Sequence, residues 1–324
     1  MFLLRRFNFY VIYEEINDSN INKLVVSKKS YMFERSIRFL KGFWRLTRLE
    51  HGLILIVAVF IGAIITSKSL IPLDQFIYAS LSVLCIEAGV FALNDYFDLE
   101  VDIRNKRMDR PLVSGDLKPK TAFYLSSILI PLGVFFSIFL NWICFLIAMI
   151  NAIVSVFYDL KFKEFKLVGN FYIAFTMAIP FIFGSAMMTT EIPVIIYFIS
   201  LIAFLSGVGR EITKDVMDIE GDILRNTRSF PLIIGEKKSI KLAVLFYLTA
   251  VILSLIPFIV NIDEIFFYNL KYLVIVVISD ALFIYICLRM LFKSDIRDLE
   301  FERRYSLVAM SIGLLAFLVG AFFG

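Results

Sequence analysis

The sequence is poor in the residues that most often bind transition metals, since its 324 residues include one histidine and three cysteines. Cys85, Cys144 and Cys287 lie far apart in apolar segments, which indicates neither a metal-ligand cluster nor a disulfide framework. We expect them to be packing residues. His51 stands alone at the start of an apolar segment, so we interpret it as a polar residue at the membrane interface. A zinc or copper site is therefore not indicated.

Charged residues are also scarce outside short loops, because hydrophobic residues make up 60% of the chain and charged residues 19%. A soluble domain interrupts its apolar runs every few residues, whereas these runs reach the roughly 20 residues that span a bilayer. We therefore predict an all-α integral membrane bundle of nine transmembrane helices. The expected spans are residues 52–67, 76–94, 121–140, 142–158, 169–188, 192–209, 239–260, 270–292 and 305–323.

The N-terminal stretch differs from the rest because it has no clear hydrophobic period and no signal-peptide cleavage site. We assign residues 1–43 to an N-terminal cytoplasmic extension and residues 44–324 to the transmembrane domain. The segment MFERSIRFLKGFW, which begins at Met32, fits a basic amphipathic helix lying on the membrane surface. One hypothesis is that Met32 is the true start of the protein.

Positive charge is distributed unevenly between the two ends of the predicted spans. The loops after spans two, four, six and eight are rich in Lys and Arg, whereas Lys68 and Lys271 are the basic residues found in the opposite loops. Basic loops stay in the cytoplasm, so we predict a multi-pass protein of the cell membrane. The N-terminus and the ends of spans two and six would face the cytoplasm.

Two acidic motifs lie at the ends of spans two and six. NDYFDLEVD runs from Asn94 to Asp102, and KDVMDIEGD runs from Lys214 to Asp222. In each motif the aspartates are spaced three and then four residues apart, which places them within roughly 60° on one helix face. A solvated acidic face is the plain interpretation of one such motif, but its repetition favours a shared metal site. The aspartates are Asp95, Asp98, Asp102, Asp215, Asp218 and Asp222.

Oxygen-rich clusters of this kind suit hard divalent cations, and Mg²⁺ commonly shares its coordination sphere with substrate phosphates. Basic residues in the same loops could bind phosphate oxygens. An apolar bundle beneath them suggests a substrate with a diphosphate head and a hydrocarbon tail. A phosphotransferase for CDP-activated lipids is a rival class, but its Asp-Gly and Ala-Arg signature is missing. A transporter ranks lower because the motif charges gather at one membrane face.

The motifs carry a family resemblance that extends from about Trp44 to the C-terminus. NDYFDLEVD followed by RPLVSGDL resembles the first aspartate motif of UbiA-type intramembrane prenyltransferases, and KDVMDIEGD resembles their second. YDLKFKEFKLVGN is similar to the family's Tyr-x-x-Lys stretch. The resemblance implies Mg²⁺-dependent transfer of a prenyl group from an allylic diphosphate. It also implies a UbiA-like helical bundle around a cavity that opens to the cytoplasm.

The resemblance assigns roles to individual residues. The implied metal-binding residues are Asn94, Asp95, Asp98, Asp102, Asp215, Asp218 and Asp222, of which Asp98, Asp102, Asp218 and Asp222 are the expected catalytic residues. The implied substrate-binding residues, which would hold the diphosphate, are Arg48, Lys106, Arg107, Tyr158, Lys161, Arg210 and Lys214. For Lys163, Lys166, Lys237 and Lys238 we prefer a role in topology or lipid-headgroup contact.

Within the family, REITKDVMDIEGD and the FPLIIG after it most resemble archaeal synthases of digeranylgeranylglyceryl phosphate. The implied reaction transfers a geranylgeranyl group from its diphosphate to geranylgeranylglyceryl phosphate in ether-lipid biosynthesis. The alternative is prenylation of an aromatic quinone precursor or of haem by the same chemistry. The expected partners are an isoprenyl diphosphate, a lipid or aromatic acceptor and membrane lipids, and no nucleic acid.

Two further acids fall inside predicted spans. Glu87 lies seven residues before Asn94 and hence on the same helix face. It could line the cavity and bind the acceptor, or it could form a helix–helix hydrogen bond. Asp280 has no motif around it, so a structural contact is the better interpretation.

Overall fold

A computed structural model of the protein describes residues 36–162, 165–224, 227–292 and 298–323. Within these ranges the chain forms helices and short connections without strands. Nine helices of the described residues are long and apolar enough to cross a membrane, which confirms the predicted all-α bundle. They are α2 (Leu49–Ser67), α3 (Leu73–Phe97), α5 (Pro119–Ile138), α6 (Trp142–Phe157), α7 (Lys166–Met188), α8 (Val194–Met217), α11 (Glu236–Ile259), α12 (Leu270–Phe292) and α13 (Glu300–Phe323).

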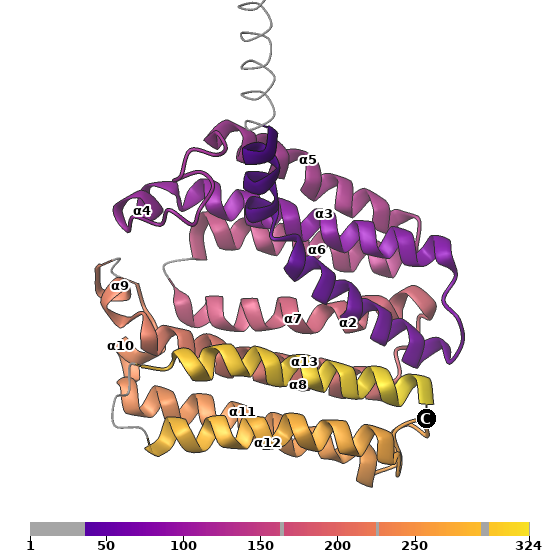
Figure 1. Ribbon diagram of the computed structural model, residues 1–324. Helices are drawn as coiled ribbons and strands as arrows, with labels where there is room; N and C mark the ends of the chain where they lie inside the picture. The colour runs from indigo at the N-terminus through magenta and orange to yellow at the C-terminus, as the bar shows by residue number, and fades with distance from the viewer. Residues whose placement is uncertain (1–35, 163–164, 225–226, 293–297, 324) are drawn as a thin grey trace, which may run out of the picture.

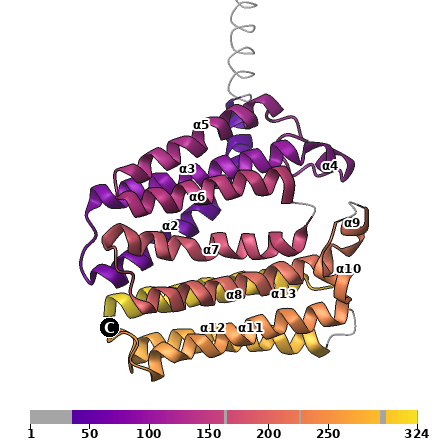
Figure 2. The same ribbon diagram turned by 180° about the vertical axis from the view of Figure 1, so that it is seen from behind.

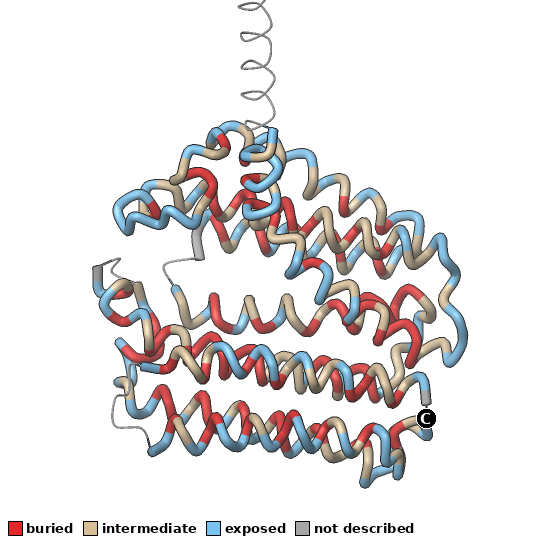
Figure 3. The backbone as a smooth tube through the Cα atoms, viewed as in Figure 1, coloured by how far each residue is buried: buried red, intermediate tan, exposed pale blue. Residues whose placement is uncertain are grey.

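The helices run roughly along one common direction and stack into a single bundle (Figure 1). α3, α5 and α6 form one side, α11 and α12 form the other, and α7, α8 and α13 lie between them (Figures 1 and 2). Exposed residues cover the outward faces of the outer helices, as Figure 3 shows. These faces carry large apolar side chains such as Ile128, Ile252 and Val274, as expected for contact with lipid.

The described part of the predicted N-terminal extension is a helix over residues 36–47 that precedes α2. Its Leu46 is fully buried and packs with Ala92, Leu112 and Leu117, so this helix is anchored to the bundle. Phe39, Leu40 and Trp44 are exposed on its other face. The proposed start at Met32 lies outside the described residues.

Each aspartate motif continues from a spanning helix into a helix of six residues. α4 (Leu99–Arg104) follows α3, and α9 (Ile219–Leu224) follows α8. Both short helices lie at the same end of the bundle, and the C-terminus lies at the opposite end (Figures 1 and 2). The two acidic ends therefore share one mouth of the bundle. α8 extends to Met217, eight residues beyond the predicted end of the sixth span, and in this extension Arg210 and Lys214 both form ion pairs with Glu211.

The second motif repeats the first after an offset of 120 residues that needs no gap. Asp98 and Asp218 both occupy the break between the long and the short helix, with φ of −82° and −104°. Beyond the short helices the equivalence continues through Pro111 and Pro231 to glycines with positive φ, at Gly115 (79°) and Gly235 (86°). The same local structure is thus built twice. A short helix, α10 (Phe230–Ile234), occurs in the second copy.

The first helices of the two copies, α2 and α7, cross at a pair of glycines. A Cβ atom at Gly62 would overlap the backbone carbonyl oxygen of Phe181, and one at Gly184 would overlap that of Val59. Gly62 thus packs against α7 three residues before Gly184, and Gly184 packs against α2 three residues before Gly62. Small residues of this kind allow membrane helices to approach closely. Thr66 donates a hydrogen bond to Ser185 across the same crossing (2.7 Å).

We predict that Gly62→Ala or Gly184→Ala destabilises the protein by about 1–3 kcal/mol, because the added methyl group forces two backbones apart. Thermal unfolding in detergent would measure the loss. Gly313→Ala is the matched control, since a Cβ there would meet only the Ser279 hydroxyl at an ordinary 3.4 Å. Equal unfolding temperatures for all three variants would contradict this account of the crossing.

Candidate active site

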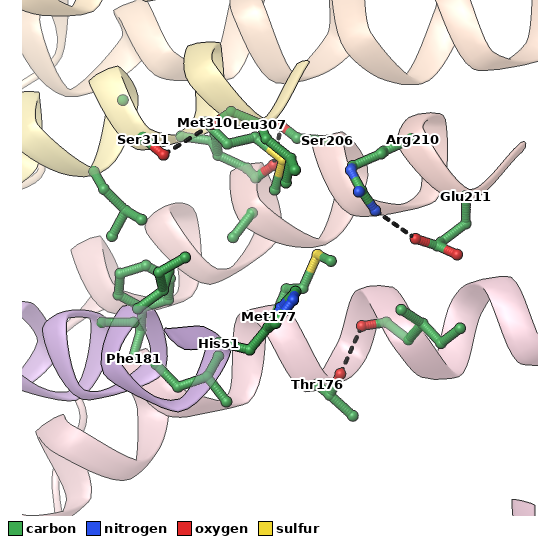
Figure 4. Close-up of a pocket in the computed structure, with 18 of the residues that line it drawn as sticks. His51, Thr176, Met177, Phe181, Ser206, Arg210, Glu211, Leu307, Met310 and Ser311 are labelled. Carbon is green, nitrogen blue, oxygen red and sulfur yellow. Dashed lines mark hydrogen bonds and ion pairs between the residues drawn. The ribbon is translucent and has the colours of Figure 1, made fainter. Parts of the chain in front are cut away.

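A cavity of about 540 Å³ lies inside the bundle and is lined by residues of α2, α3, α6, α7, α8, α11, α12 and α13. Its walls are largely apolar, and Figure 4 shows Met177 and Phe181 of α7 opposite Leu307 and Met310 of α13. The charged lining comes mainly from the ends of helices that meet near the acidic mouth. Such a combination suits a ligand with a long apolar part and an anionic head.

Five of the residues predicted to bind substrate or metal line this cavity, and they come from four helical segments. They are Arg48, Asn94, Tyr158, Arg210 and Lys214. The six motif aspartates are not among the lining residues and lie beyond the cavity, at the mouth of the bundle. Asp95, Asp102, Asp215 and Asp222 are buried there, Asp98 is half-buried, and Asp218 is exposed.

The second motif converges on one ammonium group, that of Lys166 at the start of α7. The Lys166 Nζ atom lies 3.5 Å from Asp215 Oδ1, 3.5 Å from Asp218 Oδ2 and 2.5 Å from Asp222 Oδ1. Asp222 is fully buried, so its charge needs a partner this close. Asn170 donates to the second Asp215 oxygen at 2.7 Å and fixes its orientation. Our preference for Lys166 as a headgroup contact was therefore wrong.

The first motif is compensated by two arginines. Asp95 Oδ1 accepts from Arg48 at 2.8 Å and from Arg110 at 2.5 Å, and Arg110 also lies 3.7 Å from Asp102. Arg48 adopts a left-handed backbone conformation (φ 44°) just before α2, which is uncommon for a residue with a side chain. Its guanidinium lies 4.2 Å from the centre of the Phe91 ring. The equivalent aspartates Asp95 and Asp215 thus each meet a cation at the start of the preceding helix.

Two further polar contacts organise the charged end of the cavity. Glu211 accepts from Arg210 at 3.0 Å and from Lys214 at 2.5 Å, which holds both cations on the cavity wall (Figure 4 shows the Arg210 contact). Asn94 donates to Asp159 at 3.0 Å and so links α3 to the end of α6. The cavity therefore meets the mouth through side chains of both signs.

Several predicted site residues lie elsewhere. Lys106 and Arg107 are exposed in the loop after α4, outside the cavity lining, so their role in diphosphate binding stays a prediction. Arg107 hydrogen-bonds Asp109 and thereby lowers the pKa of that carboxyl. Tyr158 begins a π-helix (Tyr158–Phe162) instead of continuing α6, which changes its angular relation to Lys161. The Lys161 side chain lies outside the described residues.

Four contributors to the site escaped the sequence analysis as functional residues: Arg110, Asp159, Lys166 and Asn170. Arg110 and Lys166 were counted only as loop charges. The repeat offers a signal for Lys166, since both copies place a cation at the start of the helix preceding the motif helix. Asp159 and Asn170 occur in the YDLKFKEFKLVGN stretch, but nothing in their spacing shows that α6 and α7 carry them to Asn94 and Asp215.

The donor set fits a hard divalent cation. Among the described residues no group of three acidic, histidine or cysteine side chains encloses a metal-sized site. Instead, three carboxylates of one motif point at the Lys166 ammonium, which shows that this position attracts positive charge. All candidate ligands are oxygens, as Mg²⁺ prefers. Asp215, Asp218 and Asp222 are accordingly candidate ligands, and the Lys166 ammonium occupies the position on which they converge.

The other polar and sulfur-containing residues are placed as follows. Asp280 accepts from Ser254 at 2.8 Å, in agreement with a structural contact. His51 lies near the start of α2, where it lines the cavity and contacts the Phe91 ring. Cys144 and Cys287 are buried packing residues, as expected, and the described chain contains no disulfide. Glu87 lines the cavity.

Comparison with known proteins defines the class. Residues 55–308 match the UbiA prenyltransferase family. A digeranylgeranylglyceryl phosphate synthase of Archaeoglobus fulgidus is 42% identical over 285 residues, which cover 88% of this chain and 97% of that relative. A solved structure of digeranylgeranylglyceryl phosphate synthase is 34% identical, with a TM-score of 0.72 over 87% of this chain and 98% of that one.

A further solved structure, a UbiA homologue from Archaeoglobus fulgidus bound to GPP and Mg²⁺, is 20% identical. It has a TM-score of 0.65 over 87% of this chain and 99% of that one, so it shares the fold. Fold, paired aspartate motifs and relatives together define a multi-pass membrane enzyme that transfers prenyl groups. The chain belongs to the UbiA prenyltransferase family.

We predict that Lys166→Met destabilises the protein by about 3 kcal/mol, because Asp222 would be left buried without its cation. Added Mg²⁺ should raise the unfolding temperature of this variant more than that of the wild type, since three carboxylates would then share one divalent ion. Thermal unfolding with and without Mg²⁺ measures both effects. Lys238→Met, at an exposed lysine of α11, is the control and should stay within about 0.5 kcal/mol of the wild type. A Lys166→Met protein as stable as the control without Mg²⁺ would refute the role of Lys166.

Proposed function

We propose that this prenyltransferase moves a geranylgeranyl group from its diphosphate to geranylgeranylglyceryl phosphate, in a reaction that requires Mg²⁺. The 42% identity to a digeranylgeranylglyceryl phosphate synthase over nearly the whole chain supports the choice of substrates. The convergence of three carboxylates on one cationic position supports the metal requirement. This convergence is the observation that carries the proposal, because it explains why acidic residues are buried at the mouth of an apolar cavity.

The proposed site has a charged end and an apolar end. Asp215, Asp218 and Asp222, with the first-motif residues Asn94, Asp98 and Asp102, would hold metal directly or through water. Bound Mg²⁺ would neutralise the diphosphate and stabilise the pyrophosphate that leaves. Arg48, Arg210 and Lys214 line the adjoining cavity wall and can donate to diphosphate oxygens. Holding these groups in place lets the C–O bond break without exposing the charge to the apolar interior.

The apolar part of the cavity is the proposed prenyl site. Its volume of about 540 Å³ lies within the range of buried ligand sites. Met177, Phe181, Leu307 and Met310 give it a wall without charge (Figure 4). A hydrocarbon chain buried there gains about 0.8 kcal/mol for each CH₂ group removed from water, so chain length would contribute strongly to binding.

The proposal is tested by supplying the purified enzyme with geranylgeranyl diphosphate, Mg²⁺ and one acceptor at a time. We expect geranylgeranylglyceryl phosphate to yield a product heavier by one geranylgeranyl group, measured by mass spectrometry. Aromatic quinone precursors and haem should yield none. Prenylation of an aromatic acceptor with none of the lipid would overturn the proposed acceptor while leaving the reaction class unchanged.

The same assay tests the metal assignment. Asp98→Ala and Asp218→Ala should each lower turnover at least about a hundredfold, because each removes an oxygen ligand from the diphosphate end. Asp74→Ala is the matched control, since Asp74 is exposed in the first turn of α3, at the other end of the helix that leads to Asp98. A folded Asp98→Ala or Asp218→Ala enzyme with full turnover would refute the assignment.

We further propose that the acidic mouth faces the cytoplasm, which follows from the basic loops at that end. A cysteine replacing the exposed Met108, near α4, should react with a membrane-impermeant thiol reagent in inside-out vesicles. A cysteine replacing the exposed Leu70, at the opposite end, should react in right-side-out vesicles. The reverse pattern would invert the proposed orientation.

A further inference from the structure

One face of α3 presents a series of three different side chains to the cavity. Asn94, Phe91 and Glu87 all line it, at intervals of three and four residues. From Asn94 to Glu87 the helix axis runs about 10 Å into the membrane, at roughly 1.5 Å per residue. The series thus leads from the charged end, past an aromatic ring, to an acid inside the bundle.

The middle of this series is already a cation site. The Arg48 guanidinium lies 4.2 Å from the centre of the Phe91 ring, within the range of a cation–π contact. A positive charge is therefore favourable beside Phe91. An allylic carbon that becomes positive as its diphosphate departs from the Asn94 end would lie next to this ring.

Glu87 differs from the other acids that line the cavity. Asp159 accepts from Asn94, Glu211 accepts from Arg210, and Asp280 accepts from Ser254. In the part of the chain that the structure describes, no side chain donates a hydrogen bond to Glu87 or forms an ion pair with it. An acid inside a membrane-spanning helix is costly, and such residues mark functional positions.

The surroundings of Glu87 suit a hydroxyl group. Glu87 and Asn151 also line a side chamber of about 40 Å³ that adjoins the main cavity. In the described chain, Asn151 Oδ1 and the chamber's Ser82 Oγ are buried without hydrogen-bond partners. A chamber of this size holds a water molecule or a hydroxyl group but no ring or chain. Three oxygen-bearing side chains from α3 and α6 thus meet at a place fitted to a small polar group.

We infer that Glu87 is the general base that accepts the proton of the acceptor's attacking hydroxyl, and that Asn151 positions this hydroxyl. The inference rests on the proposed function and deepens it. The C–O bond to the diphosphate breaks and its electron pair leaves with pyrophosphate. The hydroxyl oxygen forms the new ether bond to the allylic carbon, and its proton passes to the Glu87 carboxylate. Release of the product returns that proton to solvent.

The test compares Glu87→Gln with the wild type, as full chains in lipid nanodiscs with Mg²⁺, geranylgeranyl diphosphate and geranylgeranylglyceryl phosphate. Ether formation should fall at least about a hundredfold, the usual contribution of a general base. Binding of an unreactive geranylgeranyl thiodiphosphate should stay unchanged, because the diphosphate end is intact. Asp74→Asn is the matched control, as it neutralises an exposed acid of the same helix outside the cavity lining and should keep wild-type turnover.

A second acceptor separates proton removal from mere positioning. When a thiol replaces the attacking hydroxyl, its pKa near 8.5 lets it lose the proton without a strong base. The defect of Glu87→Gln should then shrink to less than about tenfold, because the step that needs a base is bypassed. An equal defect with both acceptors would show that Glu87 only shapes the site and would overturn the inference.

The outcomes also separate this inference from the proposed function. A wild-type enzyme that forms no ether with the lipid hydroxyl refutes the proposed function, and the inference falls with it. A wild-type enzyme that forms the ether, together with a Glu87→Gln variant of equal turnover, refutes the role of Glu87 alone. The analogue-binding measurement identifies a misfolded variant, and Glu87→Asp, which keeps the carboxylate, should then restore part of the ether formation.

Discussion

The structure depends on compensating negative charge that is buried at one end of an apolar bundle. An unpaired carboxylate in such surroundings would cost several kcal/mol, so each buried motif aspartate must face a cation. Arg48 and Arg110 meet Asp95, and Lys166 meets Asp222 and its two neighbours. These contacts tie the start of α2 to α3 and the start of α7 to α8. Charge compensation therefore also determines how the helix ends come together at the mouth.

The same arrangement is built twice, and backbone packing joins the two copies. Gly62 and Gly184 bring α2 and α7, the helices that precede the two motif helices, into close contact. Within the copies, Gly89 lies against Ile130 of α5, and Gly209 lies against Tyr247 of α11. Because the close contacts are made by backbone and small residues, the helices are held in register while the cavity-facing side chains are free to differ. The fold can thus stay symmetric around a site that is not.

Whether the sequence predicted a feature of this structure depends on how far apart in the chain the residues that form it lie. The nine spans and the repeated motifs are local patterns, so hydropathy and spacing were sufficient to find them. The roles of Lys166 and Arg110 depend on contacts between segments, and a loop lysine that binds lipid looks the same in sequence as one that binds three aspartates. Lys166 was misassigned for this reason. The π-helix that begins at Tyr158 likewise leaves no signal in the residue spacing of the Tyr-x-x-Lys stretch.

The differences between the copies are greatest where chemistry is proposed. The cavity-facing series Glu87, Phe91 and Asn94 of α3 corresponds, 120 residues later, to Gly207, Glu211 and Lys214 of α8. Both copies keep the three aspartates that gather cations at the mouth. Only α3 carries an aromatic ring followed by an unpaired acid, whereas α8 carries an acid already held by Arg210 and Lys214. A symmetric cavity would offer the same groups to both sides of the reacting carbon. In the mechanism that we propose, this asymmetry would give one wall positive charge for the departing diphosphate and the other wall an acceptor for the proton.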